Sequence, residues 1–348
     1  MAIGYLERFA ADYEREHCVI EPLRPTLRRG VKVAVVGSGP AGLSFAGEMT
    51  KRGYDVTVFE ALHEIGGVLK YGIPEFRLPN KIVDAEINLL EKSGVTFVKD
   101  CIVGKTVSIK ELEEQGFAGA GLPNFMNIPG ENYINIMSSN EYLTRVNLMD
   151  AANERTDTPM NIGKKVLVVG GGNTAMDSCR TAKRLGADVT LAYRRSETEM
   201  PARLEEVKHA KEEGINFLTL HNPKEYLADE EGRVKAAVLD IMKLGEPDAS
   251  GRRSPIATGE TLTIECDQVI VAVGVSPNPL VPKSIPGLEL GRKNTIVVNE
   301  QMQSSRPELY AGGDIVRGGA TVILAMGDGR RAAKNMAERL INMSNDNK

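Results

Sequence analysis

The stretch Gly37-Ser38-Gly39-Pro40-Ala41-Gly42 decides the fold; it follows an apolar run and opens a helical pattern. This is the G-x-G-x-x-G pattern in the setting it requires. Gly37 permits a tight turn, Gly39 lets a pyrophosphate approach the backbone, and Gly42 lets the helix pack on the strand. The N-terminus of that helix then binds the phosphates. The stretch therefore predicts a βαβ unit that binds a dinucleotide.

An acidic residue stands where the second strand of this unit ends. From Lys32 to Glu60 the order is an apolar run, the glycine turn, a helical pattern over 43–51 and a second apolar run over 56–59. The Glu60 carboxylate can accept hydrogen bonds from a ribose diol. The site should therefore take an adenine dinucleotide with a free 2′-hydroxyl, the alternative being an ordinary surface loop.

The same unit returns between Lys165 and Tyr193 with a different strand end. Its turn is Gly170-Gly171-Gly172-Asn173-Thr174-Ala175, a G-x-G-x-x-A variant, and its second strand ends in Arg194-Arg195. A carboxylate there would repel a ribose 2′-phosphate, whereas guanidinium groups bind it bidentately. This site should favour NADPH over NADH, the alternative being two arginines on a solvated strand end.

A third glycine turn, Ala311-Gly312-Gly313-Asp314, lies between an apolar strand start and a helix that begins near Thr321. In flavoproteins with two dinucleotide sites, such a turn puts an acid beside the ribityl and phosphate portion of FAD, and a helix N-terminus faces the flavin pyrimidine. Alone, the turn is a common one. Its distance from the first fingerprint is explained if an NADPH domain splits the FAD fold.

The composition is that of an ordinary globular protein of about two domains. The chain has 348 residues, of which 42% are apolar and 26% charged. The 43 basic and 47 acidic residues give a charge of −4 without a polybasic block, which argues against nucleic-acid and membrane partners. No apolar run reaches the roughly 20 residues that cross a bilayer, and no signal-peptide core follows Met1, so we expect a cytoplasmic location.

Metal chemistry and side-chain catalysis find little support in the sequence. The four cysteines form no CxxC pair, and the four histidines have no triad or metal spacing. We interpret all eight as structural, surface or packing residues: Cys18, Cys101, Cys179, Cys266, His17, His63, His209 and His221. We expect no catalytic side chain, because hydride transfer from nicotinamide C4 to flavin N5 needs stacked rings and a tuned flavin potential.

Longer strings carry a resemblance to one family. They are AIGYLERF over 2–9, GGVLKYGIPEFRLP over 66–79, MPAR over 200–203, GEPDASGRR over 245–253 and AGGD over 311–314. With them, nearly the whole chain resembles the NADPH-binding, FAD-containing small (beta) subunit of glutamate synthase. That group includes the large subunit of ferredoxin:NADP transhydrogenases and resembles the flavin half of dihydropyrimidine dehydrogenase.

The resemblance implies site residues as well as an activity. The implied FAD contacts are Gly37 to Gly42, Glu60, Gly67, Val68, Arg77, Gly313, Asp314, Thr321 and Val322. The implied NADPH contacts are Gly172, Asn173, Thr174, Arg194, Arg195, Arg203, Ala272, Val273 and Gly274. The implied activity is NADPH oxidation, with electrons passing through iron–sulfur clusters to a large glutamine-dependent subunit.

The chain departs from the family pattern in two places. Family members carry a cysteine-rich iron–sulfur domain ahead of the 2–9 string, whereas this chain starts at that string. We therefore expect no cluster ligands in it: the chain is truncated or naturally short, or the clusters reside elsewhere. The family also has a hydrophobic strand where this sequence passes from Phe117 to Ala118. Losing a central strand would cost its neighbours ladder bonds and packing, so we suspect residues missing there.

We predict an α/β fold with two dinucleotide-binding, Rossmann-like domains, the NADPH domain being inserted into a split FAD domain. The predicted parts are an N-terminal arm (1–30), an FAD domain (31–137 and 276–348) and an NADPH domain (138–275). The predicted function is hydride transfer from NADPH to FAD and onward electron transfer to a large glutamate synthase subunit or an iron–sulfur protein. The alternatives are a transhydrogenase large subunit and a catalytically silent nucleotide-binding subunit.

Overall fold

The computed structural model describes residues 3–346 with internal gaps. The gaps are 23–24, 26, 109–110, 112–121, 124–125, 127, 154–155, 159, 248–250, 277–278 and 292–293. The junction of Phe117 and Ala118, where we suspect missing residues, lies outside the described residues. The chain forms two compact units: unit 1 comprises Met1–Gly67, Asn80–Ala120 and Asn278–Lys348, and unit 2 comprises Val68–Pro79 and Gly121–Pro277.

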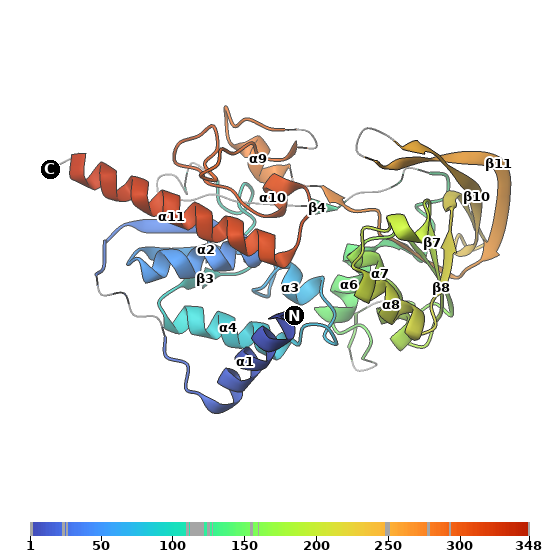
Figure 1. The fold of residues 1–348 in the computed structure, drawn as a ribbon, viewed down its shortest axis with the longest axis horizontal. Coiled ribbons are helices and arrows are strands. Elements are labelled where there is room, and N and C mark those ends of the chain that lie inside the picture. Colours follow the sequence, from blue (N-terminus) through green and yellow to red (C-terminus); the bar gives the residue numbers. More distant parts are fainter. Residues whose placement is uncertain are drawn as a thin grey trace. The chain divides into compact units, whose positions relative to one another are not determined.

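Unit 1 is built on a parallel sheet in the order β1-β2-β3, with β1 (Lys32–Val36), β2 (Asp55–Phe59) and β3 (Thr96–Val98). The first two strands are the predicted ones, and α2 (Pro40–Lys51) connects them. Valines from both strands pack with alanines of α11 (Val322–Asp346), which lies along α2 (Figure 1). A parallel strand covered by helices must be apolar on both faces, which explains the valine runs.

The other helices of unit 1 differ in how far they are buried. They are α1 (Ile3–His17), α4 (Asn80–Lys92), α9 (Leu280–Ser284) and α10 (Asp314–Arg317). Val83 and Ile87 of α4 are buried, whereas α1 buries none of its described side chains. The predicted N-terminal arm therefore contains a helix, α1, that adds nothing to the core.

Unit 2 contains a five-stranded parallel sheet in the order β5-β12-β6-β7-β8. The strands are β5 (Ile136–Ser138), β12 (Gln268–Val271), β6 (Lys165–Val169), β7 (Asp188–Tyr193) and β8 (Asn216–Thr219). Three helices, α6 (Ser139–Asn147), α7 (Asn173–Arg184) and α8 (Leu204–Glu212), lie beside it. Met176 and Cys179 of α7 are fully buried in the same cluster as Val168 and Leu191, so this face of the sheet is covered by helices.

A second sheet in unit 2 is antiparallel, in the order β11-β10-β9. It consists of β9 (His221–Ala228), β10 (Val234–Pro247) and β11 (Arg253–Glu265), to the right in Figure 1. Leu239 and Tyr226 pack with Leu167 and Val271, so this sheet contributes to a core on the parallel strands. Shorter elements are α3 (Val68–Tyr71), the 3-10 turn η1 (Glu197–Glu199), and β4 (Leu122–Pro123) paired with β13 (Val275–Ser276).

The compact units divide the chain at other positions than the predicted domains. Residues 68–79 and 121–137, which we assigned to the FAD domain, belong to unit 2. β5 belongs to unit 2 because it forms backbone hydrogen bonds with β12, a strand of that unit. For 68–79 the reason is a set of ion pairs that is described below. Which unit holds which cofactor stays a prediction at this point.

Candidate dinucleotide sites

The glycine turn of unit 1 has the backbone that a bound pyrophosphate requires. Gly37 adopts a φ of +93°, and a Cβ on Gly42 would lie 2.0 Å from the Gly37 carbonyl oxygen, so only glycine fits there. Gly39 faces open space and begins α2 without a described side-chain cap. The open helix N-terminus can accept an anion, as the fingerprint predicts.

Glu60 is tied into this turn by hydrogen bonds within the protein. Its Oε2 accepts from the Ser38 amide at 2.8 Å and from Ser38 Oγ at 2.6 Å, and its Oε1 accepts from the Leu62 amide at 3.0 Å. Glu60 is only 6% exposed. A carboxylate has about four lone-pair sites, so these bonds leave room for about one ribose hydroxyl. Glu60 is therefore a support of the loop as well as a candidate ribose ligand.

The third glycine turn meets the same helix N-terminus. Gly313 has a φ of +77°, and a Cβ added to it would lie 3.1 Å from the Ala41 Cβ atom. Asp314 is exposed, and its Oδ1 accepts from the Ala320 amide at 3.0 Å. Thr321 precedes α11, which begins at Val322, and Thr321 Oγ1 accepts from the Leu324 amide at 3.3 Å. The structure thus brings the turn at 311–314 beside the fingerprint.

Asp328 of α11 is a residue that the sequence analysis missed. It is 1% exposed, and it accepts from the Gly313 amide at 3.1 Å and from two nitrogens of Arg317 at 2.7 Å each. Burial alone would raise its pKa, but the bonds from Arg317 and Gly313 outweigh burial and hold the pKa of Asp328 below its usual value. The available signal was an acid between two glycines inside a predicted helix.

The boundary between the two units separates three predicted FAD contacts: Gly67, Val68 and Arg77. Gly67 belongs to unit 1, where its Cβ would lie 3.1 Å from Gly39 Cα. Val68 begins α3 of unit 2. Arg77 is also in unit 2, where its Nη1 donates to both Asp177 oxygens at 2.6 and 2.8 Å. The predicted FAD contact of Arg77 stays a prediction, and its guanidinium is bound by carboxylates of unit 2.

Arg77 belongs to a larger group, which we name the Arg77 cluster: Phe76, Arg77, Asp177, Arg180, Arg184, Glu206 and Glu213. Glu206 pairs with Arg77 at 2.9 Å and with Arg180 at 2.8 Å. Glu213 pairs with Arg180 at 3.0 Å and with Arg184 at 2.9 Å, and both arginines stack on the Phe76 ring. The cluster fastens residues 68–79 to α7 and α8. No local sequence signal predicts it.

The glycine turn of unit 2 repeats the first one with other supports. Gly170 has a φ of +141°, and a Cβ on it would lie 2.3 Å from the Ala272 carbonyl oxygen. Gly172 faces open space and begins α7 without a described side-chain cap. Asn173 Oδ1 accepts from the Arg203 amide at 3.0 Å. The predicted NADPH residues 172–173, Arg203 and Ala272 therefore lie around one helix N-terminus, with Thr174, Val273 and Gly274 exposed nearby in the chain.

The two arginines at the end of β7 have different surroundings. Arg194 is exposed, whereas Arg195 is half-buried and its Nε donates to the Arg253 carbonyl oxygen at 2.9 Å. Glu199, in the turn that follows, accepts from Ser196 Oγ at 2.9 Å. Hydrogen bonds from Ser196 and from the Arg253 amide, with the nearby Arg195 charge, lower the pKa of Glu199. Sequence reasoning missed Arg253 at this site, although it ends one of the family strings.

The described residues show neither a metal centre nor a membrane span. None of the His, Cys, Asp and Glu side chains in this part of the chain gather in a group of three or more that could hold a metal ion. In the same residues, no helix combines the length and the apolarity that crossing a bilayer demands. What the two glycine turns offer instead is a pair of open helix N-termini.

Comparison with known proteins identifies the family. The family model described as pyridine nucleotide-disulphide oxidoreductase matches residues 31–329, most of the chain. The chain belongs to this family. The match confirms the predicted fold class and the predicted enzyme class, an oxidoreductase, and it supports FAD and NADPH as the cofactors.

Two relatives narrow the resemblance. The glutamate synthase [NADPH] small chain of Azospirillum brasilense is 35% identical over 97% of this chain and 72% of its own length. The NADP(+)-dependent formate dehydrogenase subunit beta of Moorella thermoacetica is 38% identical over 98% of this chain, which spans only 51% of that relative. The first match confirms the resemblance to glutamate synthase small chains.

A solved structure shares the fold at low sequence identity. It is Mycobacterium tuberculosis FprA in complex with NADPH, with a TM-score of 0.75 and 20% identity over 91% of this chain and 86% of that one. At this identity the match supports the architecture of the described units and carries no residue assignments.

Proposed function

We propose that unit 1 binds FAD, that unit 2 binds NADPH, and that the chain delivers electrons to a partner as the small subunit of a glutamate synthase. That enzyme makes glutamate from glutamine and 2-oxoglutarate. The observation that carries the proposal is the pair of open helix N-termini, one with an acid and the other with two arginines at the end of the second strand. The likeness to the Azospirillum small chain supports the assignment.

In unit 1 the chain's own groups hold the dinucleotide. The free amides at the start of α2 bind the pyrophosphate, and Glu60 accepts a ribose hydroxyl while it holds Ser38. The N-terminus of α11 at Thr321 and Val322 and the Asp314 carboxylate complete the site. Gly67 remains a proposed contact in this unit, while the predicted contacts of Val68 and Arg77, which belong to unit 2, stay predictions. Bound FAD would supply a ring system that accepts a hydride and releases electrons singly.

In unit 2 the N-terminus of α7 binds the pyrophosphate of NADPH, with Gly172, Asn173 and Thr174 around it. Arg194 and Arg195 bind the ribose 2′-phosphate, with Arg203 as a further cation. The turn at 272–274, in which Val273 and Gly274 are exposed, is the proposed nicotinamide side of the site. No side chain is assigned a proton or a nucleophilic step, because these units need only to orient the two ring systems.

The electron acceptor is proposed from two relatives of similar identity. One is named as a glutamate synthase chain and the other as a formate dehydrogenase subunit. What the two names share is the use of NADP(H). We propose a large glutamate synthase subunit or an iron–sulfur protein as the partner, with the clusters outside the described residues, and the cytoplasm as the location. The Moorella likeness favours one second candidate, an electron-input subunit for another acceptor, of which the transhydrogenase large subunit is an example.

An anaerobic titration tests the proposal. The purified protein, loaded with FAD, is titrated with NADPH and then with NADH while the flavin absorbance near about 450 nm is followed. Bleaching at much lower NADPH than NADH concentration is the expected result. Flavin that stays oxidised with both would contradict the proposal and favour a silent nucleotide-binding subunit. Mixing the reduced protein with a glutamate synthase large subunit or with ferredoxin then separates the two acceptors by which one reoxidises the flavin.

A further inference from the structure

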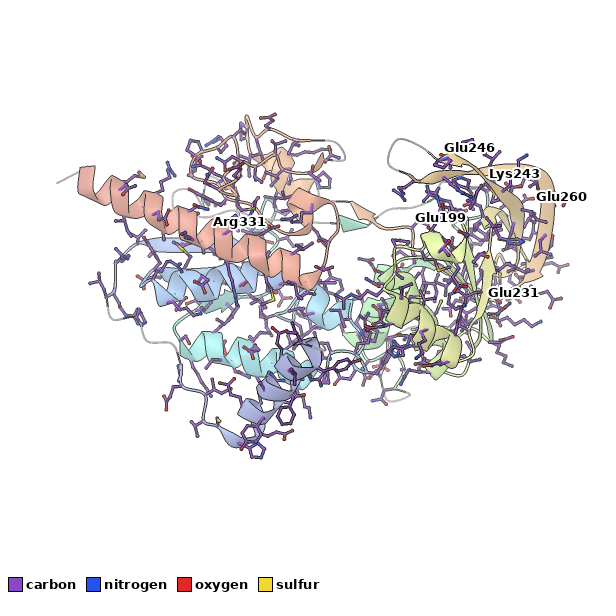
Figure 2. The ribbon with its side chains drawn as sticks, in the orientation of Figure 1. Glu199, Glu231, Lys243, Glu246, Glu260 and Arg331 are labelled. Atoms are coloured by element: carbon purple, nitrogen blue, oxygen red, sulfur yellow. The ribbon has the colours of Figure 1, made fainter. Side chains whose placement is uncertain are left out.

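The long hairpin of unit 2 returns to the proposed NADPH site. We define the β10–β11 arm as residues 234–247 and 251–265. Its second strand begins at Arg253, whose carbonyl oxygen accepts from Arg195 Nε at 2.9 Å and whose amide donates to the Glu199 carboxylate. Both main-chain groups of Arg253 are thus tied to the turn that follows β7. In Figure 2, Glu199 and Glu246 lie toward one end of the arm and Glu231 toward the other.

We call these two main-chain hydrogen bonds of Arg253 the clamp. The bond to Arg195 fixes the direction of the Arg195 side chain. Its Nε is engaged by the arm, and within the described part of the chain neither of its Nη groups has a hydrogen-bond partner. A guanidinium group presents its donors in a rigid fork, so holding Nε to one carbonyl aims the Nη pair away from that carbonyl. Arg195 is therefore prepared to give two parallel hydrogen bonds to an oxyanion.

The clamp also gathers positive charge. Arg194, Arg252 and Arg253 are all exposed, and they come from two segments that the clamp joins. The acid in this group, Glu199, uses its carboxylate on Ser196 and on the Arg253 amide. Two or more cations around one point attract a doubly charged phosphate more strongly than a neutral hydroxyl.

We propose that the β10–β11 arm forms the second wall of the ribose 2′-phosphate site, with Arg253 as the positioning residue for Arg195 and with the Arg252 and Arg253 side chains as additional cations. The proposal rests on the proposed binding of NADPH to unit 2. It adds that discrimination between NADPH and NADH depends on a segment 58 residues beyond Arg195 in the sequence.

The test uses adenosine 2′,5′-bisphosphate and 5′-AMP as probes, measured by isothermal titration calorimetry on the full chain. The wild type is expected to bind the bisphosphate more tightly than 5′-AMP. The double variant Arg252→Gln, Arg253→Gln is expected to bind the bisphosphate about tenfold more weakly, with 5′-AMP binding unchanged and a smaller salt dependence. Arg233→Gln is the control, because Arg233 lies one residue before the arm, at the end away from Arg253, and pairs with Glu231.

Two single variants separate charge from position. Arg253→Lys keeps the charge and the main-chain carbonyl, so it should retain most of the affinity for the bisphosphate. Arg195→Lys keeps the charge but loses the Nε donor that bonds the Arg253 carbonyl, so it should lose affinity about as Arg195→Gln does. Circular dichroism of each variant checks that the fold is intact.

The outcomes are distinct. A double variant that binds the bisphosphate like the wild type overturns the role of the Arg252 and Arg253 side chains, while the NADPH proposal stands. An Arg195→Lys variant with full affinity overturns the positioning of Arg195. A wild type that binds the two probes equally contradicts the NADPH site itself and the arm with it. Weakening in the double variant and not in Arg233→Gln supports the inference.

Discussion

The two glycine turns have the same backbone form but are stabilised differently. In unit 1 the second strand ends in Glu60, which is buried and bonds the turn through Ser38. In unit 2 the corresponding strand ends in Arg194 and Arg195, of which the first is exposed and the second bonds a distant strand. The acid supports its own loop, whereas within the described residues neither arginine is bonded to the glycine turn of unit 2. Changes at the acid should therefore disturb folding, and changes at the arginines should disturb selectivity alone.

The largest effect is expected for Gly42→Ala. The added Cβ would lie 2.0 Å from a backbone oxygen that cannot move without opening the turn, so we expect a loss of about 3 kcal/mol or more in the stability of unit 1 and little bound flavin. Thermal unfolding and the flavin-to-protein absorbance ratio measure this. Gly172→Ala is the matched control, because that position faces open space. Equal stability and flavin content in the two variants would contradict the close-contact explanation.

Replacing Arg194 and Arg195, which follow β7, by glutamine should strongly reduce the preference for NADPH over NADH and change stability little. Loss of charge-assisted bonds to the 2′-phosphate costs about 1.5–3 kcal/mol, which is roughly ten- to a hundredfold in the preference for NADPH over NADH. The ratio of the two reduction rates at limiting nucleotide measures it. An unchanged ratio in the double variant Arg194→Gln, Arg195→Gln would refute the specificity argument for this strand end.

Glu60→Gln should instead lower stability and flavin content together. In glutamine an NH2 group stands where one carboxylate oxygen was, and it cannot accept a hydrogen bond from Ser38 or Leu62. We therefore expect the free energy of unfolding to fall by about 1–3 kcal/mol. Urea unfolding of the flavin-free protein isolates the structural part. Glu86→Gln, on the exposed face of α4, controls for the charge. If the flavin-free variant were as stable as the wild type, Glu60 would act as a ligand only.

The smallest effect concerns pH and compares two buried aspartates. Burial raises the pKa of Asp177 to about 6, although Arg77 acts to lower it. The folded state then binds a proton that the unfolded state has lost, so stability falls as pH rises from about 4 to about 6, by on the order of 2 kcal/mol. Asp177→Asn should remove this fall, which urea unfolding at several pH values can detect.

Asp328 should change stability with pH in the opposite direction. Its pKa is held below the usual value, so its contribution is present above about pH 4 and is lost as pH falls below that. In Asp328→Asn the acid-side loss of stability should shrink. Identical pH profiles for the wild type and both variants would show that neither carboxyl group has a shifted pKa in the folded protein.

The parts that the sequence could predict depend on neighbours in the chain. The turn at 37–42 needs glycine for reasons of local backbone form, and the valine runs at 33–36 and 56–59 follow from burial of a parallel strand. The structure confirms these elements. It also places Gly313 beside Ala41, which agrees with the prediction that the third glycine turn belongs to the same fold as the first.

The unpredicted parts depend on contacts between distant segments. Arg77 is one basic residue among many in the sequence, and only the fold places Asp177 and Glu206 around it. The same holds for Asp328 under Gly313 and for Arg253 beside Arg195. Single side chains that meet across a hundred residues leave no periodic pattern, so composition and spacing cannot reveal them.

The packing of α11 on α2 has a consequence for protein synthesis. The ribosome makes the fingerprint turn before most of unit 2, and it makes α11, with Asp328 and Gly329, after unit 2. Until those residues emerge, Ala41 lacks its neighbour Gly329 and the turn at 313 lacks Asp328. Unit 2 is synthesised in between and has all its strands earlier. The nascent chain therefore completes unit 2 before unit 1, and the proposed dinucleotide site of unit 1 is complete only after α11 has been synthesised.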